Sequence, residues 1–204
     1  MRALKWFIGI LAGILLPLFL IGFLLPSEHE AETSLLIDAP TSQFFDQVTD
    51  FRNLVEWHQD FADREEVEYE FPGESAGVGA ELHYHVNGQG GVWRIENVEE
   101  DAFVLMRTVG RDATDFHFDQ VDLDEGFRVF VGVRPPLESR FDFAPERGGT
   151  RVTWRVTADF GNNIPGRYLG LFLDEVLGSD MRSGLLNLRH IVESQPPTPF
   201  EDDD

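Results

Sequence analysis

The sequence contains no cysteine at all and only one lysine, Lys5. Without cysteine, the chain has no disulfide framework, no thiolate ligand for a metal ion and no thiol nucleophile. Its 16 Lys and Arg residues are outnumbered by 37 Asp and Glu, which gives a formal net charge of −21 at pH 7. Such an acidic chain repels the phosphates of nucleic acids and the headgroups of anionic lipids. We therefore predict no nucleic-acid partner and no docking of the folded domain on an anionic lipid surface.

Apolar residues, in contrast, are plentiful. Hydrophobic residues make up 42 % of the 204 residues and aromatic residues 12 %, including 18 Phe. A chain of this length and composition suits one domain with a substantial core. The same composition fits a solid core or a core that surrounds a ligand, so it leaves these two alternatives open.

The N-terminus carries an uncharged run from Trp6 to Leu25. As a helix, these residues would extend over about 30 Å, the thickness of the apolar layer of a bilayer. Arg2 and Lys5 precede the run, and acidic residues follow it, so the positive-inside rule leaves the N-terminus in the cytoplasm. The alternative is a cleaved signal peptide, whose apolar region is normally about 7–15 residues long and ends in small residues. We predict a single-pass membrane anchor over residues 1–26 and an extracytoplasmic domain, periplasmic if the source is bacterial.

The rest of the chain divides by composition. Residues 27–33 are short and acidic and are predicted to be a linker. Residues 34–195 carry the apolar patterns of one folded domain. Residues 196–204 are rich in proline and acidic residues, and we expect this tail to be disordered.

Two apolar patterns near the C-terminus define the fold. From Thr150 to Ala158, apolar and polar residues alternate, which gives a strand with one apolar face. From Leu177 to Val192, apolar residues recur every three or four positions, which is one stripe of an α-helix. A strand with an apolar face that leads into a long amphipathic helix indicates a curved sheet closed over by its C-terminal helix.

Other patterns supply the remaining elements. Asn87-Gly88 is the strongest hairpin signal in the chain and joins two strand-like segments. Pro40 suits the first turn of a helix. Helices are predicted from Pro40 and over 51–57, and strands over 34–37, 67–71, 81–86, 91–98, 102–109, 139–143 and 150–158, with residues 115–121 and 127–133 strand-like but harder to place.

Several segments in the C-terminal part follow one another in a characteristic order and spacing. They are Thr150-Arg-Val-Thr-Trp154, the turn Gly161-Asn162-Asn163, Arg167-Tyr-Leu-Gly-Leu171, Gly184-Leu-Leu-Asn-Leu188 and Glu193. Over residues 33–195 the chain resembles the polyketide cyclase/dehydrase and lipid-transport family, the SRPBCC or START-like family. The resemblance implies an α+β helix-grip fold, in which a seven-stranded antiparallel sheet wraps around a long C-terminal helix and encloses an apolar cavity.

The resemblance also implies a function. We expect a hydrophobic or amphipathic small molecule, or a lipid, to bind in the cavity, with no cofactor and no metal. The alternatives are a cyclase- or dehydratase-like enzyme that acts on a small apolar substrate, and a protein-interaction domain with a filled core. The candidate cavity residues are Trp57, Tyr84, Trp93, Arg107, Phe141, Phe143, Trp154, Leu169, Phe172, Leu177 and Met181.

Residues 168–173 are predicted to form a lid at the mouth of the cavity, with Gly166, Gly170 and Gly178 as hinges. Arg107 lies in a strand with apolar residues on both of its faces, so the pattern does not show which face points inward. If it points inward, it can bind a carboxylate or phosphate; if it points outward, it lies on a solvated sheet face.

Two polar motifs have a chemical interpretation. Gly73-Glu-Ser-Ala-Gly77 matches the nucleophile elbow of hydrolases, but a strand rather than a helix follows Ser75, so we reject that interpretation. Glu81, His83 and His85 lie on one face of a strand and could bind a metal, yet the other face is the more apolar. We therefore predict that these three side chains point into solvent; with the opposite register they would line the cavity.

An enzyme with this fold needs an acid or base that points inward. The candidates are His58, His83 and His117, and Asp60 could pair with His58. The sequence does not select one of them. We therefore expect binding rather than catalysis.

Overall fold

The structure is a computed structural model that describes residues 2–62, 67–86, 89–110, 119–124, 127–131 and 135–194. The predicted tail, 196–204, lies outside the described residues, as does His117. The elements in chain order are α1 (Arg2–Leu24), β1 (Glu28–Ile37), α2 (Thr41–Thr49), α3 (Phe51–Trp57), α4 (Gln59–Ala62), β2 (Val67–Glu70), β3 (Glu81–Val86), β4 (Gln89–Glu99), β5 (Phe103–Gly110), β6 (Asp119–Asp124), β7 (Phe127–Val131), β8 (Leu137–Glu146), β9 (Gly149–Asp159), α5 (Ile164–Gly170) and α6 (Leu173–Ser194).

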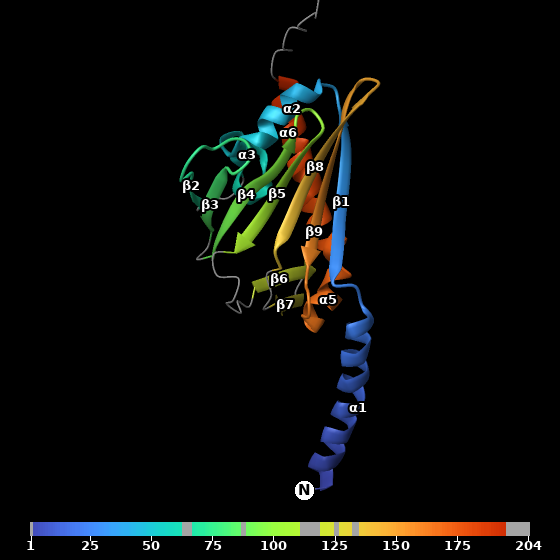
Figure 1. The fold of residues 1–204 in the computed structure, drawn as a ribbon. Coiled ribbons are helices and arrows are strands. Elements are labelled where there is room, and N and C mark those ends of the chain that lie inside the picture. The colour runs from blue at the N-terminus through green and yellow to red at the C-terminus, as the bar shows by residue number, and fades with distance from the viewer. Residues whose placement is uncertain are drawn as a thin grey trace, which may run out of the picture.

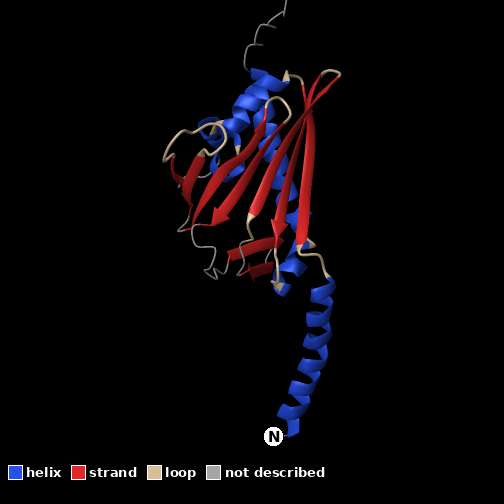
Figure 2. Cartoon of the chain, in the orientation of Figure 1, coloured by secondary structure: helices blue, strands red, loops and turns tan. Residues whose placement is uncertain are grey.

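Seven strands form one antiparallel sheet in the order β1-β9-β8-β5-β4-β3-β2. The long helix α6 runs along one face of this sheet, and the short helices α2 and α3 cover the same face near its upper end (Figure 1). Figure 2 shows the resulting two layers, helices behind and strands in front. The predicted α+β helix-grip architecture is therefore confirmed. β6 and β7 pair with each other in a small separate sheet.

The alternation in β9 separates the two faces of the sheet. Val152, Trp154 and Val156 are buried on the inner face, against the helices, while the residues between them are partly exposed. On α6, the buried side chains repeat at helical spacing and face the same interior. They are Met181, Leu185, Leu188 and Val192.

The outer face of the sheet carries ion pairs. Arg155 pairs with Glu32, Arg151 with Glu146, and Arg140 with Asp142. These pairs are partly exposed, so each contributes little to stability. They explain why so many charged residues occur within apolar strands without entering the core.

The first strand is longer than the sequence pattern predicted. β1 begins at Glu28, paired with Asp159, and not at Ser34, so the predicted linker is part of the sheet. The glutamates of this segment lie on the outer face, while Ala31 is fully buried on the inner face. The strand was missed because an edge strand with one solvated face shows few apolar residues.

The predicted hairpin between residues 81 and 98 is confirmed by its strand pairing. Val86 lies opposite Gln89, and Leu82 opposite Trp93. The turn residues, Asn87 and Gly88, lie outside the described residues.

The prediction for the N-terminal helix requires a correction. Within the described residues, no helix is long and apolar enough to cross a membrane. This finding contradicts the predicted single-pass anchor and the localisation that followed from it. The prediction rested on the absence of charge between Trp6 and Leu25, and it did not foresee that the end of α1 makes polar contacts with α5.

Those contacts come from two side chains of α5. Arg167 donates hydrogen bonds to the carbonyl oxygens of Phe23 (3.2 Å) and Leu25 (3.0 Å), and Tyr168 donates to the carbonyl oxygen of Leu18. Gly22 lies against Ile164 and Tyr168, where a larger residue would collide. The end of α1 is thus held against α5.

Candidate functional site

A cluster of aromatic rings lies between the sheet and the helices. We call it the aromatic cluster, and it surrounds one histidine, His58. Its rings come from the end of α3, from α4 and from three strands of the sheet. They are Trp57, Phe61, Trp93, Phe141 and Trp154.

His58 is buried in this cluster, with 1 % of its surface exposed. Its ring centroid lies 4.7 Å from that of Trp93 and 4.9 Å from that of Trp154. The backbone fixes this position, because the His58 N–H caps α3 by donating to Leu54 O and the His58 carbonyl accepts from the N–H of Phe61. An imidazole therefore lies among aromatic faces, where a helix end turns into the core.

Trp154 presents an unpaired donor to the same interior. The residue is 3 % exposed, and its Nε1 atom is buried with no hydrogen-bond partner in the part of the chain that the structure describes. In contrast, the Nε1–H of Trp57 donates to the carbonyl oxygen of Gln47 at 3.1 Å. Buried polar groups are nearly always paired in folded proteins, so an orphaned indole N–H at this depth requires an explanation.

The opposite wall of the cluster is α6. A Cβ atom at Gly184 would lie 3.0 Å from Cζ3 of Trp154, so glycine at this position lets α6 approach the ring. Asn187 also reaches from α6 and donates to the carbonyl oxygen of Trp57 at 3.3 Å. The helix and the sheet thus meet at Trp57 and Trp154.

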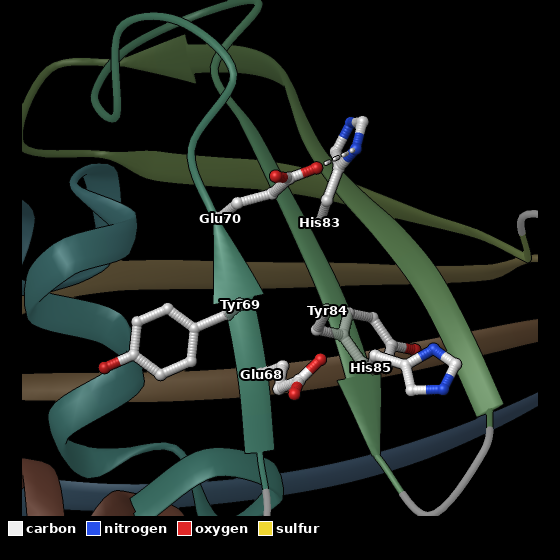
Figure 3. Close-up of a pocket in the computed structure, with 6 residues that line it drawn as sticks. All are labelled: Glu68, Tyr69, Glu70, His83, Tyr84 and His85. Carbon is white, nitrogen blue, oxygen red and sulfur yellow. Dashed lines mark ion pairs between the residues drawn. The ribbon is translucent and has the colours of Figure 1, made fainter.

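A second feature is a groove on the sheet at its β2 edge (Figure 3), with a volume of about 370 Å³. Its lining comes from β2 and β3, where Glu70 lies opposite His83 and Glu68 opposite His85. Tyr69 and Tyr84 complete the lining.

Charged hydrogen bonds surround His83, which lines this groove. His83 Nε2 lies 2.9 Å from a carboxylate oxygen of Glu81, and its Nδ1 lies 3.8 Å from Glu70. Arg94 donates to the other oxygen of Glu81. The hydrogen bond with His83 lowers the pKa of Glu81 below its ordinary value of 4.5, and the hydrogen bond from Arg94 lowers it further. The predicted outward orientation of Glu81 and His83 is confirmed.

No metal-ligating arrangement accompanies these residues. Among the residues that the structure describes, no three His, Asp or Glu side chains are placed to hold a metal ion together. Ser75 is equally unlike a nucleophile, because the loop that contains it leads into β3 and not into a helix.

Residues 28–193 match the family model described as polyketide cyclase / dehydrase and lipid transport. The chain belongs to this family. The match spans the whole sheet and α6, as the resemblance had implied. No curated protein matches the chain.

Solved structures share the fold of this SRPBCC domain at low sequence identity. Protein CV1439 from Chromobacterium violaceum is 14 % identical, with a TM-score of 0.51 over 82 % of this chain and 99 % of that one. A protein from Arthrobacter aurescens is 12 % identical, with a TM-score of 0.52 over 86 % of this chain and 92 % of that one. DynU16, from the dynemicin biosynthetic locus, is 16 % identical, with a TM-score of 0.51 over 83 % of this chain and 49 % of that one. At these identities the likeness concerns the fold alone.

Within this SRPBCC fold, four of the candidate cavity residues meet. Trp57, Trp93, Phe141 and Trp154 are all members of the aromatic cluster. Tyr84 borders it through Phe61, with ring centroids 5.6 Å apart. No ligand contact of these residues has been tested, so their role in binding stays a prediction.

Other candidate residues lie further away. Phe143 stacks on Phe44 of α2 at 6.5 Å, and Met181 is buried on α6, with Leu177 packed against the core. Leu169 is half-buried on α5, while Phe172 is exposed. Most of the set therefore belongs to, or packs against, one hydrophobic core.

Arg107 lies on the opposite side of the sheet from the aromatic cluster. In the pairing of β4 with β5, Arg107 lies opposite Arg94. Trp93, the residue before Arg94, is buried on the inner face, so Arg94 and Arg107 lie on the outer face. The guanidinium of Arg107 lies 3.0 Å from Glu138 and 3.5 Å from Glu96. It is thus part of the outer ion pairs and does not line the interior.

The predicted lid divides between α5 and the start of α6. Two of its three glycines are in close contact: a Cβ at Gly170 would lie 2.1 Å from Cδ2 of His29, and one at Gly166 would lie 2.5 Å from Cδ1 of Phe160. Gly178 has no such neighbour. Gly166 and Gly170 therefore serve close packing, and the lid motion stays a prediction.

The sequence interpretation missed His29. This residue lies on the inner face of β1, its ring centroid is 6.0 Å from that of Phe160, and its buried Nε2 has no hydrogen-bond partner in the described part of the chain. His29 lies two residues before Ala31, so both side chains are on the same face of β1. A predicted strand that began at Glu28 would have indicated this inner position. The side chain of Asp60, predicted to pair with His58, lies outside the described residues.

Proposed function

We propose that this SRPBCC domain binds a hydrophobic or amphipathic small molecule, lipids included, between the inner face of the sheet and α6. The observation that carries the proposal is the unpaired, buried indole N–H of Trp154 in an aromatic interior. Ligand sites in proteins are mostly apolar and aromatic, with a few polar groups that orient the ligand. His58 and Trp154 are such groups in this interior.

The composition of the interior favours an uncharged ligand. Among the described residues, the buried polar side chains are Gln43, Gln47, Thr49, His58, Ser75, Ser139 and Thr150, and no lysine, arginine, aspartate or glutamate is among them. Affinity would come mainly from burial of apolar ligand surface, at roughly 25 cal/mol per Å², less the cost of ordering the ligand. A charged ligand would lose its hydration here without gaining an ion pair.

One observation also favours an enzyme. The His58 imidazole is buried at the centre of the aromatic cluster, where it would contact a bound substrate. An imidazole can take and return a proton near neutral pH, as a cyclase or dehydratase requires. In that alternative, His58→Gln abolishes turnover and leaves substrate binding nearly intact.

Native mass spectrometry of the purified full chain, followed by solvent extraction, tests the binding proposal. We expect a co-purified small molecule whose mass adds to that of the chain and disappears after extraction. A ligand-free mass, together with no uptake from a lipid extract or from a panel of apolar compounds, would reject it. The interaction-domain alternative would then be preferred.

A further inference from the structure

The two tryptophans at the junction of sheet and α6 differ in one respect. Both are buried, and their ring centroids are 6.3 Å apart in an edge-to-face arrangement. The Nε1–H of Trp57 is satisfied by Gln47, whereas that of Trp154 is not satisfied by any described residue. The fold can therefore pair a buried indole at this site, and at Trp154 it does not.

Four groups surround the indole of Trp154. Phe141 stacks on it at 4.9 Å with an interplanar angle of 27°, and Trp57 meets it edge to face. Gly184 has no side chain, and the ring centroid of His58 lies 4.9 Å from that of Trp154. None of these groups accepts a hydrogen bond from Trp154 Nε1, and leaving a buried donor unpaired is unfavourable.

We propose that Trp154 is the specificity-determining residue of the site and that its indole N–H donates a hydrogen bond to a neutral carbonyl oxygen of the bound ligand. A neutral acceptor is favoured over a carboxylate because the described interior holds no buried arginine or lysine, and Arg107 lies outside. The ligand class is therefore an apolar ketone, ester or similar carbonyl compound. This inference rests on the proposed function.

The donor should discriminate between ligands of equal shape. A hydrogen bond to an otherwise unmet buried donor is expected to favour the carbonyl ligand by about fivefold to tenfold in Kd. Most of the binding would still come from apolar burial, so a hydrocarbon of the same size should bind measurably. The expected signature is a preference, and not an all-or-none response.

A pair of probes measures this preference. 2-Acetylnaphthalene carries a carbonyl, and 2-isopropylnaphthalene has a similar shape without one. Calorimetric titration of the full chain should give the tighter Kd for the ketone, and Trp154→Phe should make the two values equal. Trp57→Phe is the matched control: it removes an indole that already has a partner, so it should leave the preference unchanged.

A measurement on the unaltered chain avoids any folding defect of the variants. In a ¹⁵N–¹H spectrum, the Trp154 indole proton should move downfield when 2-acetylnaphthalene saturates the site, and not with 2-isopropylnaphthalene. The Trp57 indole resonance should not show this difference, because its hydrogen bond to Gln47 persists.

The outcomes separate the two proposals. If both probes bind with equal Kd, or if the ketone preference survives Trp154→Phe, the carbonyl inference fails and the proposed function stands. An equal response of the Trp154 indole to both probes has the same meaning. If neither probe binds and the chain also takes up nothing from a lipid extract, the proposed function fails, and the carbonyl inference fails with it.

Discussion

Gly184 of α6 faces the six-membered ring of Trp154, and a Cβ at that position would lie 3.0 Å from Cζ3. This contact sets the separation between the long helix and the inner face of the sheet. The ring cannot easily move away, because Phe141 is stacked against it. The spacing of helix and sheet at the site thus depends on the absence of one side chain.

Gly184→Ala is therefore expected to destabilise the domain by about 1 kcal/mol. Overpacking of a dense core costs roughly 1–3 kcal/mol, while alanine in a helix gains up to about 1 kcal/mol over glycine. Gly178→Ala is the control in the same helix: its Cβ would have no neighbour within 4 Å, so we expect a gain of up to about 1 kcal/mol. Urea denaturation of both variants measures the difference. Equal changes in the two would show that Trp154 does not restrict α6.

Gly170→Ala is expected to weaken the packing of α5 on β1, because its Cβ would collide with the imidazole of His29. We expect a loss of about 1–3 kcal/mol. The double variant His29→Ala/Gly170→Ala removes the colliding ring, so the two changes should not be additive. A double-mutant cycle by urea denaturation measures the coupling. Additive effects would contradict a direct contact between these residues.

Stability should depend on pH through Glu81. Hydrogen bonds from His83 and then Arg94 lower its pKa below 4.5 in the folded chain. A lowered pKa stabilises the fold above the unfolded value, and this contribution is lost as the pH falls through the folded value. Glu81→Gln should therefore cost about 0.5 kcal/mol at pH 7, and its stability should converge with that of the unaltered chain well below pH 4.5.

The matched control for this experiment is Glu68→Gln. Glu68 lies on the neighbouring strand and lines the groove, but it forms no ion pair with any described residue. Its replacement should leave the pH dependence of unfolding nearly unchanged. A Glu81 variant that behaved like the Glu68 variant at every pH would contradict the prediction.

Arg167→Ala should release the end of α1 from α5. The guanidinium donates to the carbonyl oxygens of Phe23, Leu25 and Gly161. Because these hydrogen bonds are half-exposed and screened by solvent, together they should stabilise the contact by about 1 kcal/mol. Hydrogen exchange of the last α1 amides should become faster, with little change in the strands. Arg182→Ala, an exposed position on α6, serves as control. Unchanged exchange in α1 would show that Tyr168 alone holds the helix.

The sequence predicted those parts of the fold in which a repeated pattern reports on burial. The alternation in β9 and the stripe of α6 each repeat a period over many residues, and Asn87-Gly88 carries the turn chemistry of a hairpin between two strand-like segments. Trp57, Trp93, Phe141 and Trp154 were among the candidate cavity residues, and all four are buried in the interior. Their meeting around His58 could not be predicted, because distances between strands and helices are not encoded in any one segment.

Single polar residues were the harder part. His58 follows a helix end, where no periodicity separates a buried from a solvated side chain, so the sequence left both alternatives open. Arg107 belongs to a strand with apolar residues at both parities, and only the pairing with β4 and β8 shows that it faces outward. The start of β1 and the contacts of α1 with α5 depend on partners that are distant in the chain.

The acidic residues of β1 have a consequence for how copies of the chain meet. β1 is ten residues long and ends the sheet, and an edge strand presents backbone groups with which a second strand can pair; of these groups, the Glu32 N–H already donates to Asp174 of α6. Glu28, Glu30 and Glu32 lie on one side of this edge. Two such edges brought together would place carboxylates close to carboxylates, and this repulsion opposes aggregation through strand addition.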